Sequence, residues 1–182
     1  KGFGTIIEKM PKMKKLGEKV DDTDLYQSIG KDSANILRWV ILTCRSNFLL
    51  LPRELEFPQF RSTNKDLRCF QFMALTASPE QENIFQQLKK KYGSRFLWHG
   101  SATDRWHSII RQGLKNLSNT SYMACGAAHG EGIYFAPDSG TSLGYSRTFK
   151  NLYGNSALGE NFYIIALCEV IKLPLNKDIE FT

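Results

Sequence analysis

The stretch RFLWHGS, residues 95–101, decides how the rest of the chain is interpreted. Its aromatic and apolar residues are typical of a β-strand, which is expected to end where His99 meets Gly100. A glycine at that point lets a flat ligand approach the backbone closely, next to an imidazole. A lone histidine at a strand end is more often a structural residue with satisfied hydrogen bonds, so other segments have to decide between the two interpretations.

Helices are predicted on both sides of this strand. Residues 79–91 form the clearest one, because Ser78 can cap its start and Gly93 can end its lysine-rich last turn. Earlier in the chain, residues 37–42 resemble a buried helix with Ser33 as its N-cap.

A further helix is predicted at about 103–112, where Thr103 or Ser101 could serve as the cap. Its apolar residues recur at helical spacing and are expected in the core. They are Trp106, Ile109, Ile110 and Leu114.

Strands are predicted at 132–136 and 162–171, the second with the continuous apolar content of a central strand. Residues 49–52 and 67–75 resemble shorter strands or extended segments. Because strands and helices do not alternate regularly, a doubly wound sheet is disfavoured. The expected fold class is α+β, with mainly antiparallel sheets and packed helices.

The chain carries a net charge of +6 and has a pI of about 9.1. Lysines crowd residues 1–24, which we expect to form a basic peripheral leader ahead of one domain at 25–182. Nucleic-acid binding is compatible with this charge, but no zinc-finger or helix-turn-helix signature supports it.

The four cysteines, Cys44, Cys69, Cys125 and Cys168, are too scattered for a zinc knuckle or a redox pair. They fit a reducing compartment better than a disulfide scaffold. No signal peptide or membrane span is recognisable. We therefore expect an intracellular protein, in the nucleus or the cytoplasm, without a bound metal.

A second polar segment follows the helix at 103–112. Residues 115–130 form a long polar loop, of the kind that is either functional or disordered. Tyr134 is expected on the strand after it, and a short helix should extend to about Tyr145. Ser142 lies three residues before Tyr145, so both share one face of that helix. Half-buried tyrosines and a surface serine would explain the segment without any ligand.

Taken together, the motifs resemble the catalytic domain of the poly(ADP-ribose) polymerase superfamily, most closely its mono-ADP-ribosyltransferase branch. Strong resemblance spans about 92–171, and weaker resemblance reaches back to about 35. Several separate motifs in the right order are far more specific than any one of them. They are His99-Gly-Ser101, Trp106 to Leu114, Gly126-Ala-Ala128, Gly132 to Ala136, Gly144-Tyr-Ser146 and Ile165 to Val170.

The resemblance implies an ADP-ribosyltransferase-like fold and assigns roles toward NAD+ as co-substrate. The backbone N–H and C=O of Gly100 would pair with the nicotinamide carboxamide, and the Ser142 hydroxyl would join them. Tyr145 would stack on the nicotinamide ring, a flat contact suited to a tyrosine.

For the ribose groups, the resemblance implies that Tyr134 packs over the nicotinamide ribose. His99 would hydrogen-bond the adenosine ribose with support from Ser101. His99 and Tyr134 are therefore the expected catalytic residues, and loop 116–130 corresponds to the loop over the NAD site.

The implied reaction breaks the nicotinamide–ribose bond through an oxocarbenium-like state and transfers ADP-ribose to a protein side chain, this chain itself included. The alternative is a catalytically inactive module that binds NAD or ADP-ribose, or that contacts another protein.

Polymerising relatives carry a catalytic glutamate on a strand further downstream. Glu169 lies on an earlier strand and Glu180 comes too early, so neither is expected in that role. The domain is expected to be C-terminally incomplete, with its last strands absent. The branch that the chain resembles commonly lacks this glutamate, which points to single transfers.

Overall fold

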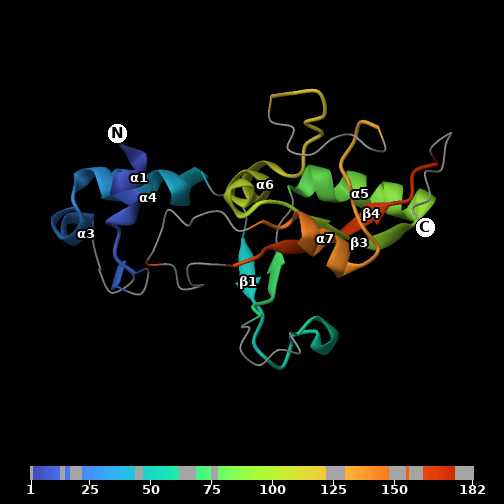
Figure 1. Ribbon diagram of the computed structural model, residues 1–182, viewed down its shortest axis with the longest axis horizontal. Coiled ribbons are helices and arrows are strands. Elements are labelled where there is room, and N and C mark those ends of the chain that lie inside the picture. Colours follow the sequence, from blue (N-terminus) through green and yellow to red (C-terminus); the bar gives the residue numbers. More distant parts are fainter. Residues whose placement is uncertain are drawn as a thin grey trace.

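The computed structural model shows an α+β fold with helices around small antiparallel sheets (Figure 1). This confirms the fold class expected from the sequence. The structure describes residues 2–12, 15–16, 22–43, 47–61, 69–74, 78–121, 130–147, 155 and 162–174.

The sheet that carries the His-Gly-Ser segment consists of β3 (Ser94–Gly100) and β4 (Ile165–Ile171). All seven residues of each strand pair in antiparallel register, from Ser94 opposite Ile171 to Gly100 opposite Ile165. Both strands are rich in β-branched and aromatic residues, which fit a half-buried pleated surface. In the described part of the chain, β4 pairs with β3 alone, so its predicted central position is not seen there.

The opposite edge of β3 carries a single bridge instead of the full strand predicted at 132–136. Trp98 and Ala136 exchange two backbone hydrogen bonds, of 2.7 and 2.8 Å, and the pairing ends there.

Two helices pack on this sheet. α5 (Pro79–Tyr92) has the start and stop that the sequence predicts, because the Ser78 hydroxyl accepts from the Gln81 amide and Gly93 adopts φ 76°. α7 (Ser139–Tyr145) is capped by Asp138, whose carboxylate accepts from the backbone N–H of Thr141. Figure 1 shows α7 lying alongside β3 and β4.

The helix predicted at 103–112 begins later than expected. Residues 103–105 form the 3₁₀ turn η2, and α6 (Trp106–Gln112) follows it. Neither Thr103 nor Ser101 caps this helix, because the Thr103 hydroxyl binds the carbonyls of Arg147 and Phe162 instead. Trp106 is buried, as the apolar stripe predicts.

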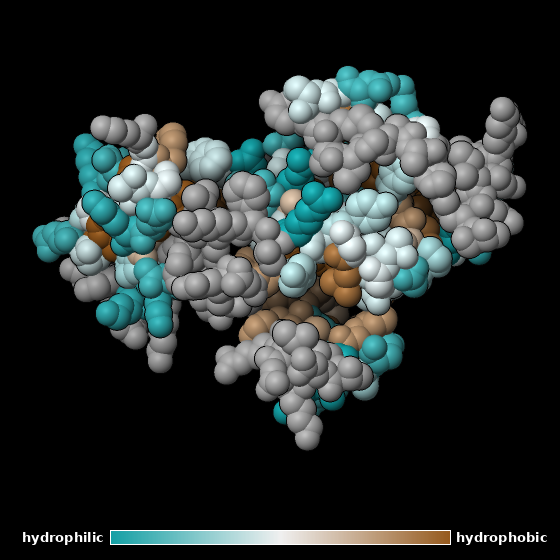
Figure 2. All heavy atoms as spheres, viewed as in Figure 1, coloured by the Kyte–Doolittle hydropathy of each residue, from teal (hydrophilic) through white to brown (hydrophobic). Residues whose placement is uncertain are grey.

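A second sheet pairs β1 (Phe48–Leu50) with β2 (Phe72–Ala74), close to the two extended segments expected from the sequence. Between them lies the 3₁₀ turn η1 (Pro58–Phe60). All six residues of the two strands are exposed, although all six are apolar. Figure 2 shows this apolar surface near the centre of the view, over β1 and β2.

The N-terminal helices are α1 (Phe3–Glu8), α3 (Asp22–Ile29) and α4 (Lys31–Thr43), which gather at one end of the molecule (Figure 1). α4 covers the predicted helix at 37–42 but is less buried than expected, since Ile41 and Leu42 are exposed. It also begins at Lys31, so Ser33 lies inside the helix and is not its cap.

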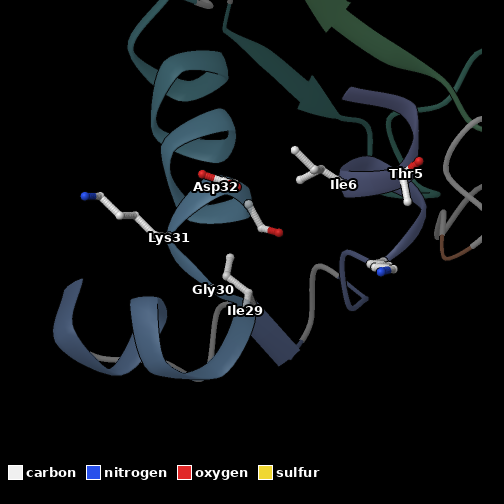
Figure 3. Close-up of a pocket in the computed structure, with 8 residues that line it drawn as sticks. Thr5, Ile6, Ile29, Gly30, Lys31 and Asp32 are labelled. Carbon is white, nitrogen blue, oxygen red and sulfur yellow. The ribbon is translucent and has the colours of Figure 1, made fainter. Parts of the chain in front are cut away.

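Within the predicted leader, Met10 and Leu16 are buried. An open hollow of about 270 Å³ lies between α1 and the start of α4, lined in part by Ile6, Ile29 and Asp32 (Figure 3). The Arg111 guanidinium of α6 lies 5.2 Å from the centre of the Trp39 ring, which joins α4 to the rest of the fold. None of the helices in the described ranges is long and apolar enough to span a bilayer.

Candidate active site

His99 lies near the end of β3, and the segment that carries Tyr134 and Ala136 holds its ring in place. Its Nδ1 is 2.9 Å from the carbonyl oxygen of Tyr134. Because a carbonyl only accepts hydrogen bonds, Nδ1 carries the proton, and in the neutral ring Nε2 is left as an acceptor. The ring also contacts Phe135 and Trp106, with centroids 5.6 and 6.3 Å away. The half-buried imidazole is therefore held in one orientation.

Gly100 directs its backbone N–H and C=O away from β4. In an antiparallel ladder, successive residues direct these groups to opposite edges of their strand. Trp98 uses both of its groups on the Ala136 edge, so Gly100, two residues further on, faces that same edge. Beyond the bridge, no described residue hydrogen-bonds Gly100 there. The result is an open donor and acceptor pair, which is what a carboxamide complements.

α7 closes against this position from the side. A Cβ on Gly100 would lie 1.8 Å from the carbonyl oxygen of Ser142, so only glycine allows this approach. Ser142 itself is 3% exposed. Tyr145, one turn further along α7, is 55% exposed and leaves a free aromatic face. The structure thus brings Gly100 and Ser142 into direct contact and places Tyr145 on the neighbouring helical turn.

Ser101 is held by a residue that the sequence places only in the core. The indole Nε1 of Trp106 donates to the Ser101 carbonyl oxygen over 3.0 Å. The apolar stripe predicts the burial of Trp106 but gives no sign of this hydrogen bond. The bond anchors the backbone immediately after Gly100.

The loop predicted over the site falls partly outside the described residues, which omit 122–129. At its two described ends, the side chains of Asn119 and Glu131 are hydrogen-bonded to each other. The Tyr134 hydroxyl donates to the Gly130 carbonyl, and Tyr134 is 38% exposed. The two ends of the loop therefore meet beside Tyr134.

Glu169 lies along the sheet from His99, toward its other end. It is opposite Phe96, three residues along β3 from His99, or about 10 Å at strand spacing. Its carboxylate accepts from Ser94 Oγ at 2.5 Å and lies 2.6 Å from Lys89 Nζ. Hydrogen bonding to Lys89 and then to Ser94 lowers its pKa. This pairing explains Glu169 as a tie between α5 and β4. Glu180 lies outside the described residues.

No group of three or more His, Cys, Asp or Glu residues gathers at metal-binding distance within the described ranges. The expectation of a reaction without a metal stays a prediction. Burial raises the pKa of the Cys168 thiol, which suits an inert core cysteine.

The geometry can be compared with known proteins. The profile of the poly(ADP-ribose) polymerase catalytic domain matches residues 54–175. Protein mono-ADP-ribosyltransferase PARP8 of Mus musculus is 42% identical over 166 residues, covering 76% of this chain and 18% of the relative. The Homo sapiens protein of the same name is 42% identical over 113 residues, covering 61% and 12%.

Poly [ADP-ribose] polymerase 1 of Gallus gallus is 28% identical over 118 residues, covering 62% of this chain and 12% of the relative. The chain spans less than a fifth of the length of these three relatives. The two proteins named mono-ADP-ribosyltransferase share more identity with it than this polymerase does, which agrees with the expected branch. Because the profile match covers more than half of its residues, this chain belongs to the poly(ADP-ribose) polymerase catalytic domain family of NAD+ ADP-ribosyltransferases.

Proposed function

We propose that this chain carries the NAD+ site of a protein mono-ADP-ribosyltransferase. The observation that supports this best is the open N–H and C=O pair of Gly100, facing the edge of β3 where the bridge to Ala136 ends. Membership of this family supports NAD+ as the co-substrate. Two relatives are named mono-ADP-ribosyltransferases, which supports the transfer of a single ADP-ribose.

The residues fit the nicotinamide half of NAD+. A carboxamide accepts from an N–H and donates to a C=O, as the Gly100 backbone requires, and the Ser142 hydroxyl can add a third hydrogen bond. The missing Cβ of Gly100 lets α7 lie directly against that backbone, which keeps Ser142 next to it. The exposed ring of Tyr145 offers a flat surface for stacking.

His99 and Tyr134, on the other side of the β3 end, would contact the two ribose groups of NAD+. With its Nδ1 donating to Tyr134, the His99 ring presents Nε2 as an acceptor for a ribose hydroxyl. Tyr134 is partly exposed and can pack over the second ribose. Together these contacts would hold NAD+ bent, so that positioning and charge stabilisation lower the barrier.

The chemistry is a displacement at the ribose carbon bonded to nicotinamide. That C–N bond breaks, and nicotinamide leaves as a neutral molecule with the bonding electron pair. A nucleophilic side chain of the acceptor protein forms the new bond to the same carbon and releases its proton. The chain's own residues bind and orient the leaving group in this step.

Labelled NAD+ tests the proposal directly. The chain is incubated with NAD+ labelled in the adenylate half, and label on protein and free nicotinamide are both measured. We expect both, and we expect Tyr145→Ala to reduce both. Tyr163→Ala is the matched control, because Tyr163 is a similarly exposed tyrosine at 63% and has no proposed role in the site.

Two other outcomes would contradict the proposal, the first at the transfer step and the second at the nicotinamide site. Tight binding with NAD+ recovered intact would favour an inactive module that binds NAD or ADP-ribose. Label that appears in equal amounts with Tyr145→Ala and the unaltered chain would exclude the proposed nicotinamide site.

A further inference from the structure

Two hydroxyl groups join the chain segments around the proposed nicotinamide site. The first belongs to Ser146, the residue after α7, which is 2% exposed. Its Oγ donates to the Ile164 carbonyl over 2.9 Å and accepts from the Ile164 amide over 3.0 Å. One buried side chain therefore satisfies both backbone groups of the residue that precedes β4.

The second hydroxyl belongs to Thr103, in the 3₁₀ turn after β3. Its Oγ1 lies 3.0 Å from the Arg147 carbonyl and 3.2 Å from the Phe162 carbonyl. The Thr103 amide also donates to the Arg147 carbonyl, over 3.1 Å. Thr103 thus connects the residue two places after α7 to the segment that leads into β4.

The joined positions flank the residues assigned to nicotinamide. Thr103 follows Ser101 by two residues, just after the strand that provides Gly100, and Ser146 follows Tyr145 directly. α7 ends at Tyr145, and the amide of the next residue, Ser146, donates to the Leu143 carbonyl. The spacing between the Gly100 backbone and the Tyr145 ring is therefore set where these two hydroxyls bind.

We infer that Thr103 and Ser146 are positioning residues for the nicotinamide half of NAD+, acting through Tyr145. The inference rests on the proposed function. Neither hydroxyl needs to touch the ligand, since each one already has protein partners. Loss of the Ser146 hydroxyl would remove this partner from both backbone groups of Ile164, and loss of the Thr103 hydroxyl would remove it from the Phe162 carbonyl. Either loss would loosen the end of α7 relative to β3. The adenosine half would be spared, because the His99 side of the site depends on the β3–β4 pairing and on Tyr134.

Calorimetry with two probes tests this separation. Benzamide represents the nicotinamide half, and ADP-ribose represents the rest of NAD+. We expect Thr103→Val and Ser146→Ala each to weaken benzamide binding about three- to tenfold, as the loss of a neutral hydrogen bond implies, with ADP-ribose binding changed less than twofold. Thr103→Ser keeps the hydroxyl and should restore benzamide binding.

Thr43→Val is the matched control, because it deletes a threonine hydroxyl that bonds the Trp39 carbonyl at the end of α4, away from this site. It should change neither affinity. Equal benzamide binding by all variants would overturn the inference and leave the proposed function intact, and so would equal weakening of both probes. An unaltered chain that binds ADP-ribose but no benzamide would instead refute the nicotinamide site itself, and the inference with it.

Amide hydrogen exchange on the unaltered chain gives a second test that does not depend on the folding of variants. Benzamide should slow exchange at the amides of Thr103 and Ile164, because it fixes the spacing that they hold. ADP-ribose should not. Exchange at these two amides that does not respond to benzamide would contradict the inference.

Discussion

Gly100 lies against the backbone of Ser142 so closely that a Cβ at this position would be 1.8 Å from the Ser142 carbonyl oxygen. The obstacle is backbone and cannot rotate away as a side chain can. The strand end and α7 can therefore keep this contact only while residue 100 is glycine.

Gly100→Ala should destabilise the fold by about 1–3 kcal/mol, the range for inserting an atom into a packed site, and should abolish benzamide binding. Gly132→Ala is the matched control, since nothing lies within 4 Å of a Cβ there. Urea denaturation and calorimetry measure the two effects. If Gly100→Ala were as stable as the control Gly132→Ala, α7 would not be packed against residue 100.

The hydrogen bond between His99 and Tyr134 allows the structural role of His99 to be tested apart from its proposed role in ligand binding. His99→Asn keeps an N–H near the position of Nδ1 that can donate to the Tyr134 carbonyl, whereas His99→Ala does not. We expect His99→Asn to retain thermal stability and to lose about tenfold in ADP-ribose affinity, because the Nε2 acceptor is gone. Unchanged affinity in a folded His99→Asn would remove His99 from the proposed ribose contact.

The sequence predicts most of the local structure that positions the site. The aromatic strand before His99, the cap at Ser78 and the stop at Gly93 depend on neighbouring residues, so their patterns can be recognised without a structure. Family motifs then supply a role for each residue around them.

Contacts between distant segments are not predictable in this way. The Thr103 hydroxyl could have capped its own helix. Its actual partners are Arg147, 44 positions later, and Phe162, 59 positions later, and these bonds depend on how the segments pack. The same holds for Ser146, whose partner is 18 residues away. The predicted strand at 132–136 shrinks to the bridge at Ala136, since apolar content does not show where pairing ends.

Glu169 predicts a particular dependence of stability on pH. Lys89 and Ser94 lower its pKa from the ordinary value of 4.5 when the chain folds. The unfolded chain therefore binds more protons between the two pKa values, so this contribution is complete above about 4.5 and is lost as the pH falls through the lowered pKa. The stability difference between the unaltered chain and Glu169→Gln, measured by denaturation from pH 3 to 7, should follow that course.

The same variant bears on catalysis. Since Glu169 is paired with Lys89 and Ser94, about 10 Å along the sheet from His99, Glu169→Gln should transfer ADP-ribose at a rate within about twofold of the unaltered chain. That change is well below the loss expected when a catalytic acid or base is removed. A loss of a hundredfold or more, in a folded variant, would place Glu169 in the reaction after all.

Substitution of Trp106 tests how strongly the backbone of the His-Gly-Ser segment depends on the hydrogen bond from the indole of Trp106. Trp106→Phe removes the indole N–H that bonds the Ser101 carbonyl, together with part of a ring that is 6% exposed. Trp98→Phe removes the same atoms from a half-buried indole that hydrogen-bonds no described residue. Trp106→Phe should therefore cost about 1 kcal/mol more than Trp98→Phe in urea denaturation. It should also weaken ADP-ribose binding, because the freed Ser101 backbone no longer fixes the residues beside it. Equal costs for the two variants would mean that the Trp106 hydrogen bond contributes no net stability and that packing alone holds this strand end.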